Sequence, residues 1–371
     1  MRPAFSSTKE AAAFALLLLL LLAAPWLAHQ TFLPRREQSY SSQSIRWEKF
    51  PWVQKFIFEE TNDIDIAFVG SSHIGLGIDT PYVQQKLSEQ LGHETVVRSI
   101  YFIYPGFDAL YFFTKDLLAH RRVKTLVFYD ECCGPIPYLV HQCAPAWFRY
   151  GDDGGVLSGL PFGYQVIYYY AAMIGMPRNL LELVTSNMPN TPNDKMTSPF
   201  TMWHTDNPET TLGCQSLRVG FDPSGRAGNT HFTPYVPQTG VTPEDVSIFS
   251  PAKATNFVFS DRPLPISQVY FAKQFSLLAK AHGCSLVALH IPSLDESSSP
   301  VMTETRDWSA LMQTDLWLMG IAPNRFFAGL SELEVQKLSA DPGHLNANGQ
   351  RYFTSLITHE LIQFYESHSH H

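Results

Sequence analysis

Alternation of short apolar runs with segments of helical spacing, between residues 64 and 129, constrains the fold of this chain most strongly. The apolar runs are residues 64–69, 94–100 and 124–129, and the helical segments between them are residues 81–91 and 108–120. Thr80 is the expected N-cap of the first helix, with Pro81 at its first position. A β-α-β-α-β order predicts a parallel sheet joined by right-handed crossovers.

The pattern changes after residue 133 and resumes near residue 267. Residues 134–265 are expected to form a large insertion, apolar and helical at 164–184 and then rich in proline and glycine. Beyond it we expect helices at residues 267–282, 305–319 and 349–365, and strands at 284–291 and 324–328. Gly283 is the expected stop of the first of these helices.

Residues 11–28 form an unbroken run without charge. As a helix this run would be about 27 Å long, which matches the hydrocarbon core of a bilayer. A retained signal anchor and a cleaved signal peptide both fit, and each places the rest of the chain outside the cytoplasm. We therefore expect an anchor at residues 1–29, a polar tether at 30–49 and one catalytic domain at 50–371 that contains the insertion.

Composition and cysteine spacing narrow the classes of function. The chain of 371 residues is 45% hydrophobic and 16% charged with a net charge of -8, so it is globular and not an expected nucleic-acid binder. Its five cysteines allow a disulfide from Cys143 to Cys132 or Cys133, and free thiols fit equally well. No cysteine or histidine spacing indicates a metal, and no cofactor is expected.

Residues able to support nucleophilic acyl chemistry lie at the two ends of the fold pattern. Residues 70–73 (Gly-Ser-Ser-His) follow the first expected strand, and residues 341–349 read Asp-Pro-Gly-His-Leu-Asn-Ala-Asn-Gly. A serine on a glycine turn, with a late Asp-x-x-His, supplies a nucleophile, a base and a group that orients the base. The order differs from that of α/β-hydrolases, in which Asp and His arrive separately.

This arrangement resembles the SGNH/GDSL hydrolase superfamily. More narrowly, it is similar to the membrane-anchored SGNH-like proteins that serve acylation of cell-envelope polymers, such as the teichoic acid D-alanine-transfer and alginate acetylation proteins. The resemblance implies a three-layer α/β/α fold with a parallel sheet, of SGNH or flavodoxin-like type. It also implies that Ser72 is the nucleophile, that His344 is the base and that Asp341 orients His344.

The same resemblance implies oxyanion donors, and here the sequence departs from the family pattern. Candidate donors are the backbone N–H groups of Ser72 and of Gly106, the only glycine between the second and third expected strands. Where the family places an asparagine after the third strand, this chain has Asp130 and Glu131. A carboxylate would repel an oxyanion unless it is protonated or turned away, so acyl transfer fits better than efficient hydrolysis. Asp130 would then fix its loop or meet a cationic substrate group.

Three more polar residues are candidates for substrate contact. Ser71 and His73 flank the expected nucleophile, and His290 closes the fourth expected strand at the end where ligands bind in parallel sheets. For His73 the alternative is a helix-start histidine without a catalytic part, and for His290 it is a packed, hydrogen-bonded histidine.

The sequence therefore predicts an anchored, extracytoplasmic serine O-acyltransferase or esterase. It would move a small acyl group to or from hydroxyls of a cell-envelope glycopolymer, and a polytopic membrane O-acyltransferase is the partner that the resemblance implies. Two alternatives stay open: a non-catalytic polymer-binding or scaffold protein on a decayed SGNH fold, and a free secreted esterase.

Overall fold

The computed structural model of the chain divides it into two compact units. One comprises Met1–Gln54 with Ile136–Asp194, and the other comprises Lys55–Pro135 with Lys195–His371. The residues that the structure describes are 5–31, 37, 40, 51–102, 106–129, 154–168, 237–238, 240–249, 264–293, 311–314, 316–341 and 343–368. Most of the expected insertion at 134–265 lies outside these ranges, and so do Cys132, Cys133, Cys143 and Cys214.

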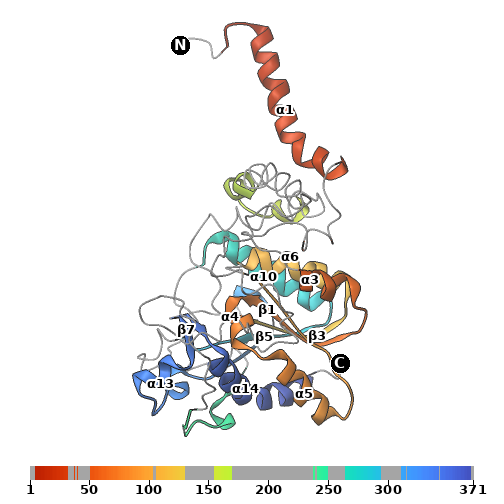
Figure 1. Cartoon of the computed structure of the whole chain (residues 1–371). Coiled ribbons are helices and arrows are strands. Elements are labelled where there is room, and N and C mark those ends of the chain that lie inside the picture. The colour runs from red at the N-terminus through yellow and green to blue at the C-terminus, as the bar shows by residue number, and fades with distance from the viewer. Residues whose placement is uncertain are drawn as a thin grey trace, which may run out of the picture. The chain divides into compact units, whose positions relative to one another are not determined.

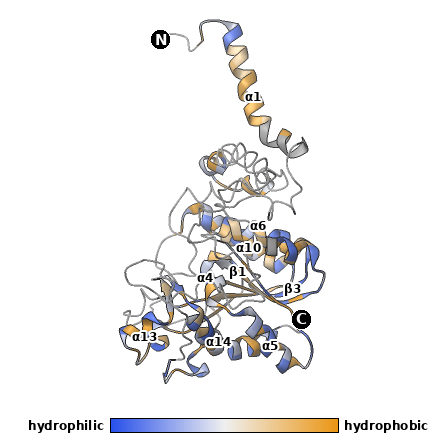
Figure 2. Cartoon of the chain, in the orientation of Figure 1, coloured by the Kyte–Doolittle hydropathy of each residue, from blue (hydrophilic) through white to orange (hydrophobic). Residues whose placement is uncertain are grey.

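The first unit is helical where it is described. Its helices are α1 (Thr8–Thr31), α3 (Pro51–Gln54) and α8 (Gly154–Leu157), and residues 162–168 are also helical. Figure 2 shows α1 as hydrophobic over much of its length, and its seven consecutive leucines are 45–63% exposed. Within the described part of the chain, no helix combines the length and apolar character needed to cross a membrane. The anchor therefore stays a prediction.

The second unit is built on a sheet of six strands, five of them parallel. The strands are β1 (Ile64–Ser71), β2 (Val97–Phe102), β3 (Val123–Tyr129), β4 (Ser247–Phe249), β5 (Ser285–Leu289) and β6 (Trp317–Gly320). Their order is β2-β1-β3-β5-β6-β4, with only β4 antiparallel to its neighbour. Taken in chain order, the parallel strands lie 2-1-3-4-5, the doubly wound order of flavodoxin-like folds. The chain reverses direction across the sheet between β1 and β3, which makes their carboxyl ends the expected ligand site.

Helices cover both faces of this sheet (Figure 1). The helices and short helical turns of the unit are η2 (Lys55–Glu59), α4 (Ser72–Gly77), α5 (Thr80–Leu91), α6 (Phe107–His120), η7 (Pro243–Asp245), α10 (Ile266–Ala281), α12 (Pro323–Phe326), α13 (Glu332–Gln336) and α14 (Ala347–His368). Helices α6 and α10 pack together over one face, while α5 and α14 lie over the other. The structure thus has the expected three-layer α/β/α architecture, and β1 is buried along almost its whole length.

Most of the expected elements are present with small shifts of their ends. Asp79, not Thr80, caps α5, because its carboxylate accepts a hydrogen bond from the backbone N–H of Tyr82 at 3.2 Å. Gly283 ends α10 as expected, with a φ of 69° that glycine adopts without strain.

Two expectations near the C-terminus are wrong. The last part of the helix expected at 305–319 is instead a strand, since residues 317–320 form β6. This apolar run is too short for its periodicity to distinguish a helix from a strand. The strand expected at 324–328 is instead the helix α12, which Pro323 opens in its first turn, the position that proline favours.

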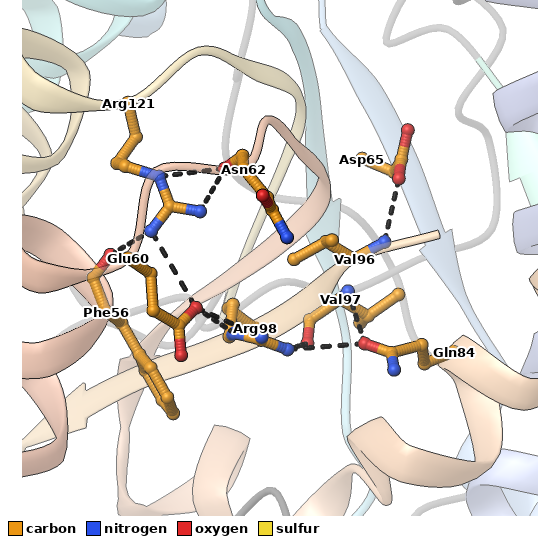
Figure 3. Close-up of polar contacts among 9 residues, drawn as sticks. All are labelled: Phe56, Glu60, Asn62, Asp65, Gln84, Val96, Val97, Arg98 and Arg121. Carbon is orange, nitrogen blue, oxygen red and sulfur yellow. Dashed lines mark hydrogen bonds and ion pairs between the residues drawn. The ribbon is translucent and has the colours of Figure 1, made fainter. Parts of the chain in front are cut away.

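At the amino end of the sheet, a cluster of charged side chains joins the starts of the strands to neighbouring loops (Figure 3). The buried guanidinium of Arg121 donates to the carbonyls of Phe56 and Asn62 and lies 3.8 Å from Glu60. Glu60 also accepts from Arg98 at 3.0 Å. Each of these charged groups has a charged or carbonyl partner. The buried guanidinium of Arg121 is therefore both hydrogen-bonded and close to an opposite charge.

A second polar network at this end attaches α14 to the sheet. Asp65 in β1 accepts from the ammonium of Lys124 at 2.8 Å and from the hydroxyl of Tyr365 at 2.6 Å. The backbone N–H of Val96 donates to its other oxygen at 2.8 Å. Burial alone would raise the pKa of Asp65, but the hydrogen bonds from Lys124, Tyr365 and Val96 outweigh burial and hold that pKa below its usual value.

Candidate active site

Ser72 begins α4 directly after β1, at the carboxyl end of an interior strand of the sheet. Its hydroxyl lies 2.8 Å from Nε2 of His344, although the two residues are 272 positions apart. Ser72 is 6% exposed and His344 is half-buried, so the contact is partly shielded from solvent. The structure thus places side by side the serine and the histidine that were paired from the sequence, and their catalytic roles stay predictions.

A short hairpin positions His344. Strand β7 (Ser339–Asp341) pairs antiparallel with β8 (His344–Leu345), and Asn346 follows directly. The side-chain amide of Asn346 donates to the carbonyl of Lys337 at 2.8 Å, which ties the two sides of the hairpin together. The asparagine of the Asp-x-x-His-Leu-Asn segment therefore fixes the backbone that carries the imidazole.

The same asparagine begins the next helix. Its side-chain oxygen accepts from the backbone N–H groups of Asn348 and Gly349 at 2.9 and 3.1 Å, which satisfies donors at the start of α14. Gly349 is required by close packing, since a Cβ at this position would lie 2.1 Å from the carbonyl oxygen of Leu338. The hairpin and α14 thus form one continuous support for His344.

Helix α14 in turn holds the segment that carries Ser72. The side-chain amide of Gln350 donates to the carbonyls of Gly75 and Ile78, at 3.2 and 2.9 Å, and all of these groups are buried. Thr354, one turn further along, accepts from the backbone N–H of Asp79 at 3.0 Å. These bonds link the C-terminal helix to the α4 segment, so nucleophile and base are positioned by the same contacts.

Asp341 is described by its backbone alone. It is the last residue of β7, and its Cα is paired in register with that of His344 across the hairpin. Its side chain is outside the described residues, and so its expected role in orienting His344 stays a prediction.

His73 is in closer contact with the base than the sequence suggested. Its ring stacks on that of His344, with centroids 4.5 Å apart and planes 29° apart. On its other side the ring of Tyr129 stacks at 4.6 Å and 10°. Nδ1 of His73 lies 3.1 Å from the hydroxyl of Ser71, which also caps α4 by accepting from the backbone N–H of His73. Tyr129 was not anticipated, although its place as the last residue of the third expected strand was a usable signal.

The remaining candidates are spread over the unit. Gly106 is the N-cap residue of α6, where a Cβ would lie 2.5 Å from side-chain oxygens of Asp108 and Gln268. His290 follows β5, is 2% exposed, and donates its backbone N–H to the carbonyl of Met319 at 2.8 Å. The expectation for Asp130 falls outside the described residues. The roles of Gly106 as an oxyanion donor and of His290 as a substrate contact stay predictions.

A cavity of about 420 Å³ opens at the opposite, amino end of the sheet. Arg122, Lys124, Lys280 and His282 are among the residues that line it, together with Cys284. Burial raises the pKa of the Cys284 thiol to about 12, so this cysteine is a poor nucleophile. None of the residues expected to take part in chemistry lines this cavity.

No metal centre competes with this interpretation in the described part of the chain, since no group of three or more His, Cys, Asp or Glu residues there is placed to hold an ion. The site that the described residues form consists of Ser72 hydrogen-bonded to the imidazole of His344, with the rings of His73 and Tyr129 stacked beyond it.

No protein-family model matches the chain, and comparisons with curated proteins and with solved structures gave no match either.

Proposed function

We propose that this protein is an SGNH-like serine O-acyltransferase or esterase that works through an acyl-enzyme on Ser72. The observation that carries the proposal is the 2.8 Å contact between the Ser72 hydroxyl and Nε2 of His344, at the carboxyl end of the parallel strand β1. A hydroxyl in hydrogen-bond contact with an imidazole is the pairing that general-base activation of a serine requires.

In the proposed reaction, the Ser72 oxygen attacks an ester carbonyl while Nε2 of His344 takes the serine proton. The tetrahedral intermediate collapses when His344 passes that proton to the leaving oxygen, and the C–O bond of the ester breaks. A sugar hydroxyl or water then attacks the acyl-enzyme and gives its proton to His344. His344 passes that proton to the Ser72 oxygen as the bond between this oxygen and the acyl carbon breaks. Asp341 orients His344, and backbone N–H groups of Ser72 and Gly106 stabilise the oxyanion in this scheme.

Geometry supports Ser72 over Ser71 as the nucleophile. The Ser71 hydroxyl is engaged with the backbone N–H and the Nδ1 of His73, at 3.2 and 3.1 Å. That hydroxyl caps α4, a structural task that many serines perform. Ser72 is the serine whose hydroxyl lies next to His344.

The acceptor, the partner and the location follow from the resemblance and are part of the proposal. A small acyl group would pass to or from hydroxyls of a cell-envelope glycopolymer, supplied by a polytopic membrane O-acyltransferase. The charge-free run at residues 11–28 and the exposed leucines of α1 support an N-terminal anchor and an extracytoplasmic site. Fractionation of cells tests this part: recovery of the intact chain in the membrane pellet is expected, and a soluble, shortened chain would favour the secreted esterase.

The enzymatic proposal is tested by labelling the full chain with a serine-directed fluorophosphonate. We expect labelling of the wild type, no labelling of Ser72→Ala, and labelling of the matched variant Ser71→Ala. Turnover of p-nitrophenyl acetate should follow the same order. If the folded wild type is not labelled, or if Ser72→Ala is labelled equally, the enzyme proposal fails and the non-catalytic scaffold is favoured.

A further inference from the structure

The ring of His73 lies between two other rings. His344 stacks on one face at 4.5 Å, and Tyr129 stacks on the other at 4.6 Å. Tyr129 is only 3% exposed and ends β3, the strand beside β1 in the sheet. The stack therefore has a fixed outer wall, and a displacement of the His73 ring away from His344 is blocked.

The edge of the His73 ring is fixed as well. Ser71 lies within hydrogen-bond distance of both the backbone N–H and Nδ1 of His73, at 3.2 and 3.1 Å. This double contact sets the rotation of the ring about its own side-chain bonds. It also directs Nδ1 toward Ser71 and not toward Ser72, so His73 is not placed to act as the base.

Stacking adds to what positions the base. A histidine side chain rotates about two bonds, and the hydrogen bond with Ser72 acts at its Nε2 atom. Stacking on a fixed aromatic ring restricts the remaining rotations, because offset-parallel contact is favoured over a tilted or withdrawn ring. Positioning of this kind increases the rate since the reacting groups spend more time in the productive geometry.

We propose that His73 is a positioning residue that holds the imidazole of His344 against Ser72 through its stacked ring. His73 directly follows Ser72 in α4, so the nucleophile and the group that holds the base belong to consecutive residues of one rigid element. The ring that stacks on His344 is thus fixed relative to Ser72 within a single turn of chain. This inference rests on the proposed serine chemistry and adds to it a residue that acts through His344.

Three variants separate the stacked ring from the hydrogen bond. His73→Phe keeps an aromatic ring without a partner for Ser71, His73→Gln keeps a polar partner without a ring, and His73→Leu fills the space with neither. The rate constant of fluorophosphonate labelling and the kcat and KM for p-nitrophenyl acetate are measured on the full chain. Thermal midpoints and near-UV circular dichroism establish that each variant is folded.

We expect His73→Phe to keep kcat within about threefold of the wild type, while His73→Leu and His73→Gln lose about 10- to 100-fold, with KM little changed. A purely structural role would lower the thermal midpoint without this division between ring and non-ring variants. Should His73→Leu not fold, the comparison of Phe with Gln decides the matter.

Equal rates for Phe and Gln, or a Gln variant faster than Phe, would overturn the inference and assign the effect to Ser71. Failure of the underlying enzyme proposal has a different signature. In that case the folded wild type itself is not labelled, or labelling does not depend on Ser72.

Discussion

The two ends of the parallel sheet use polar side chains in opposite ways. At the amino end, charged groups such as Arg121, Glu60 and Asp65 each have two or more partners, several of them backbone carbonyls or N–H groups. At the carboxyl end, the contact between Ser72 and His344 is a single hydrogen bond between a hydroxyl and an imidazole. Multiply bonded charges hold a loop in place, whereas one hydroxyl–imidazole contact can be exchanged during a reaction.

That difference separates stability from activity across one sheet. A charge in a buried cluster cannot be removed without leaving its partners unsatisfied, so substitutions there should lower the free energy of unfolding. A serine–histidine pair contributes little to folding, so substitutions there should lower the rate alone. The following predictions test this separation, from the largest expected effect to the smallest.

Loss of the base should produce the largest effect. We expect His344→Gln to lower kcat for p-nitrophenyl acetate by at least about 10³-fold, because no other group takes the Ser72 proton. The free energy of unfolding should change by no more than about 1 kcal/mol, as measured by urea denaturation. His359→Gln, an exposed histidine on α14, is the control and should leave both quantities unchanged. A large loss of stability in His344→Gln would break the separation.

Loss of the buried cation at the other end should have the reverse outcome. Arg121→Met removes the donors to the carbonyls of Phe56 and Asn62, and we expect it to cost about 3 kcal/mol of unfolding free energy. The specific activity of the remaining folded protein should equal that of the wild type. Arg122→Met, at the exposed neighbouring position, is the matched control. Equal destabilisation by the two variants would show that the cluster is not the cause.

Gln350 sharpens the comparison because it joins helix α14 to the segment that carries the nucleophile. Gln350→Met should cost about 1–2 kcal/mol, since two buried carbonyls lose their donor. We also expect kcat to fall about tenfold, because the distance between Ser72 and His344 depends on this attachment. Gln363→Met, exposed on the same helix, is the control. Destabilisation with unchanged kcat would limit Gln350 to a structural role.

The smallest expected effect is a change in pH dependence at Asp65. Its pKa is lower when folded than when unfolded, so its contribution to stability is present above about pH 4, the usual value of an aspartate, and is lost as the pH falls through the folded pKa. Asp65→Asn should therefore be less stable than the wild type at pH 7, with the difference narrowing toward pH 3. Urea midpoints at pH 3, 5 and 7 measure this effect, and a constant difference across these values would contradict it.

The same network gives an opposite expectation in alkali. Burial lowers the pKa of Lys124, but its hydrogen bonds to Asp65 and Tyr365 outweigh burial and leave that pKa raised. For the phenol of Tyr365, burial has the opposite effect and raises the pKa. The stability that Lys124 and Tyr365 contribute is fully present below about pH 10 and is lost as the pH rises through their folded pKa values. Wild-type urea midpoints should accordingly fall above that pH, and less so in Asp65→Asn.

Whether a helix or strand could be predicted from the sequence depends on whether local or long-range interactions determine it. The strands and helices up to residue 129 were predictable because strand and helix periodicities are local properties of the chain. The strand at residues 317–320 was not, because β6 is only four residues long and its identity as a strand depends on pairing with β5.

The candidate site divides along the same line. Ser72, His344 and Asp341 could be named from sequence, because residue type, order and spacing are read directly from the chain. The stack of His73 between Tyr129 and His344 could not, because it joins three segments whose packing no local pattern records.

By itself, the sequence determined a parallel α/β sheet, a glycine turn bearing two serines, and a late histidine on a tight segment. Only the tertiary structure decided what holds that histidine beside Ser72. The physical reason is that Asn346, Gln350 and Thr354 make hydrogen bonds whose partners are fixed by folding: the hairpin for the first and the α4 segment for the others. The residue type determines whether a side chain can form a hydrogen bond. The packing of α14 against α4 determines which partner it meets, as it does for Ser72 and His344, which are 272 positions apart.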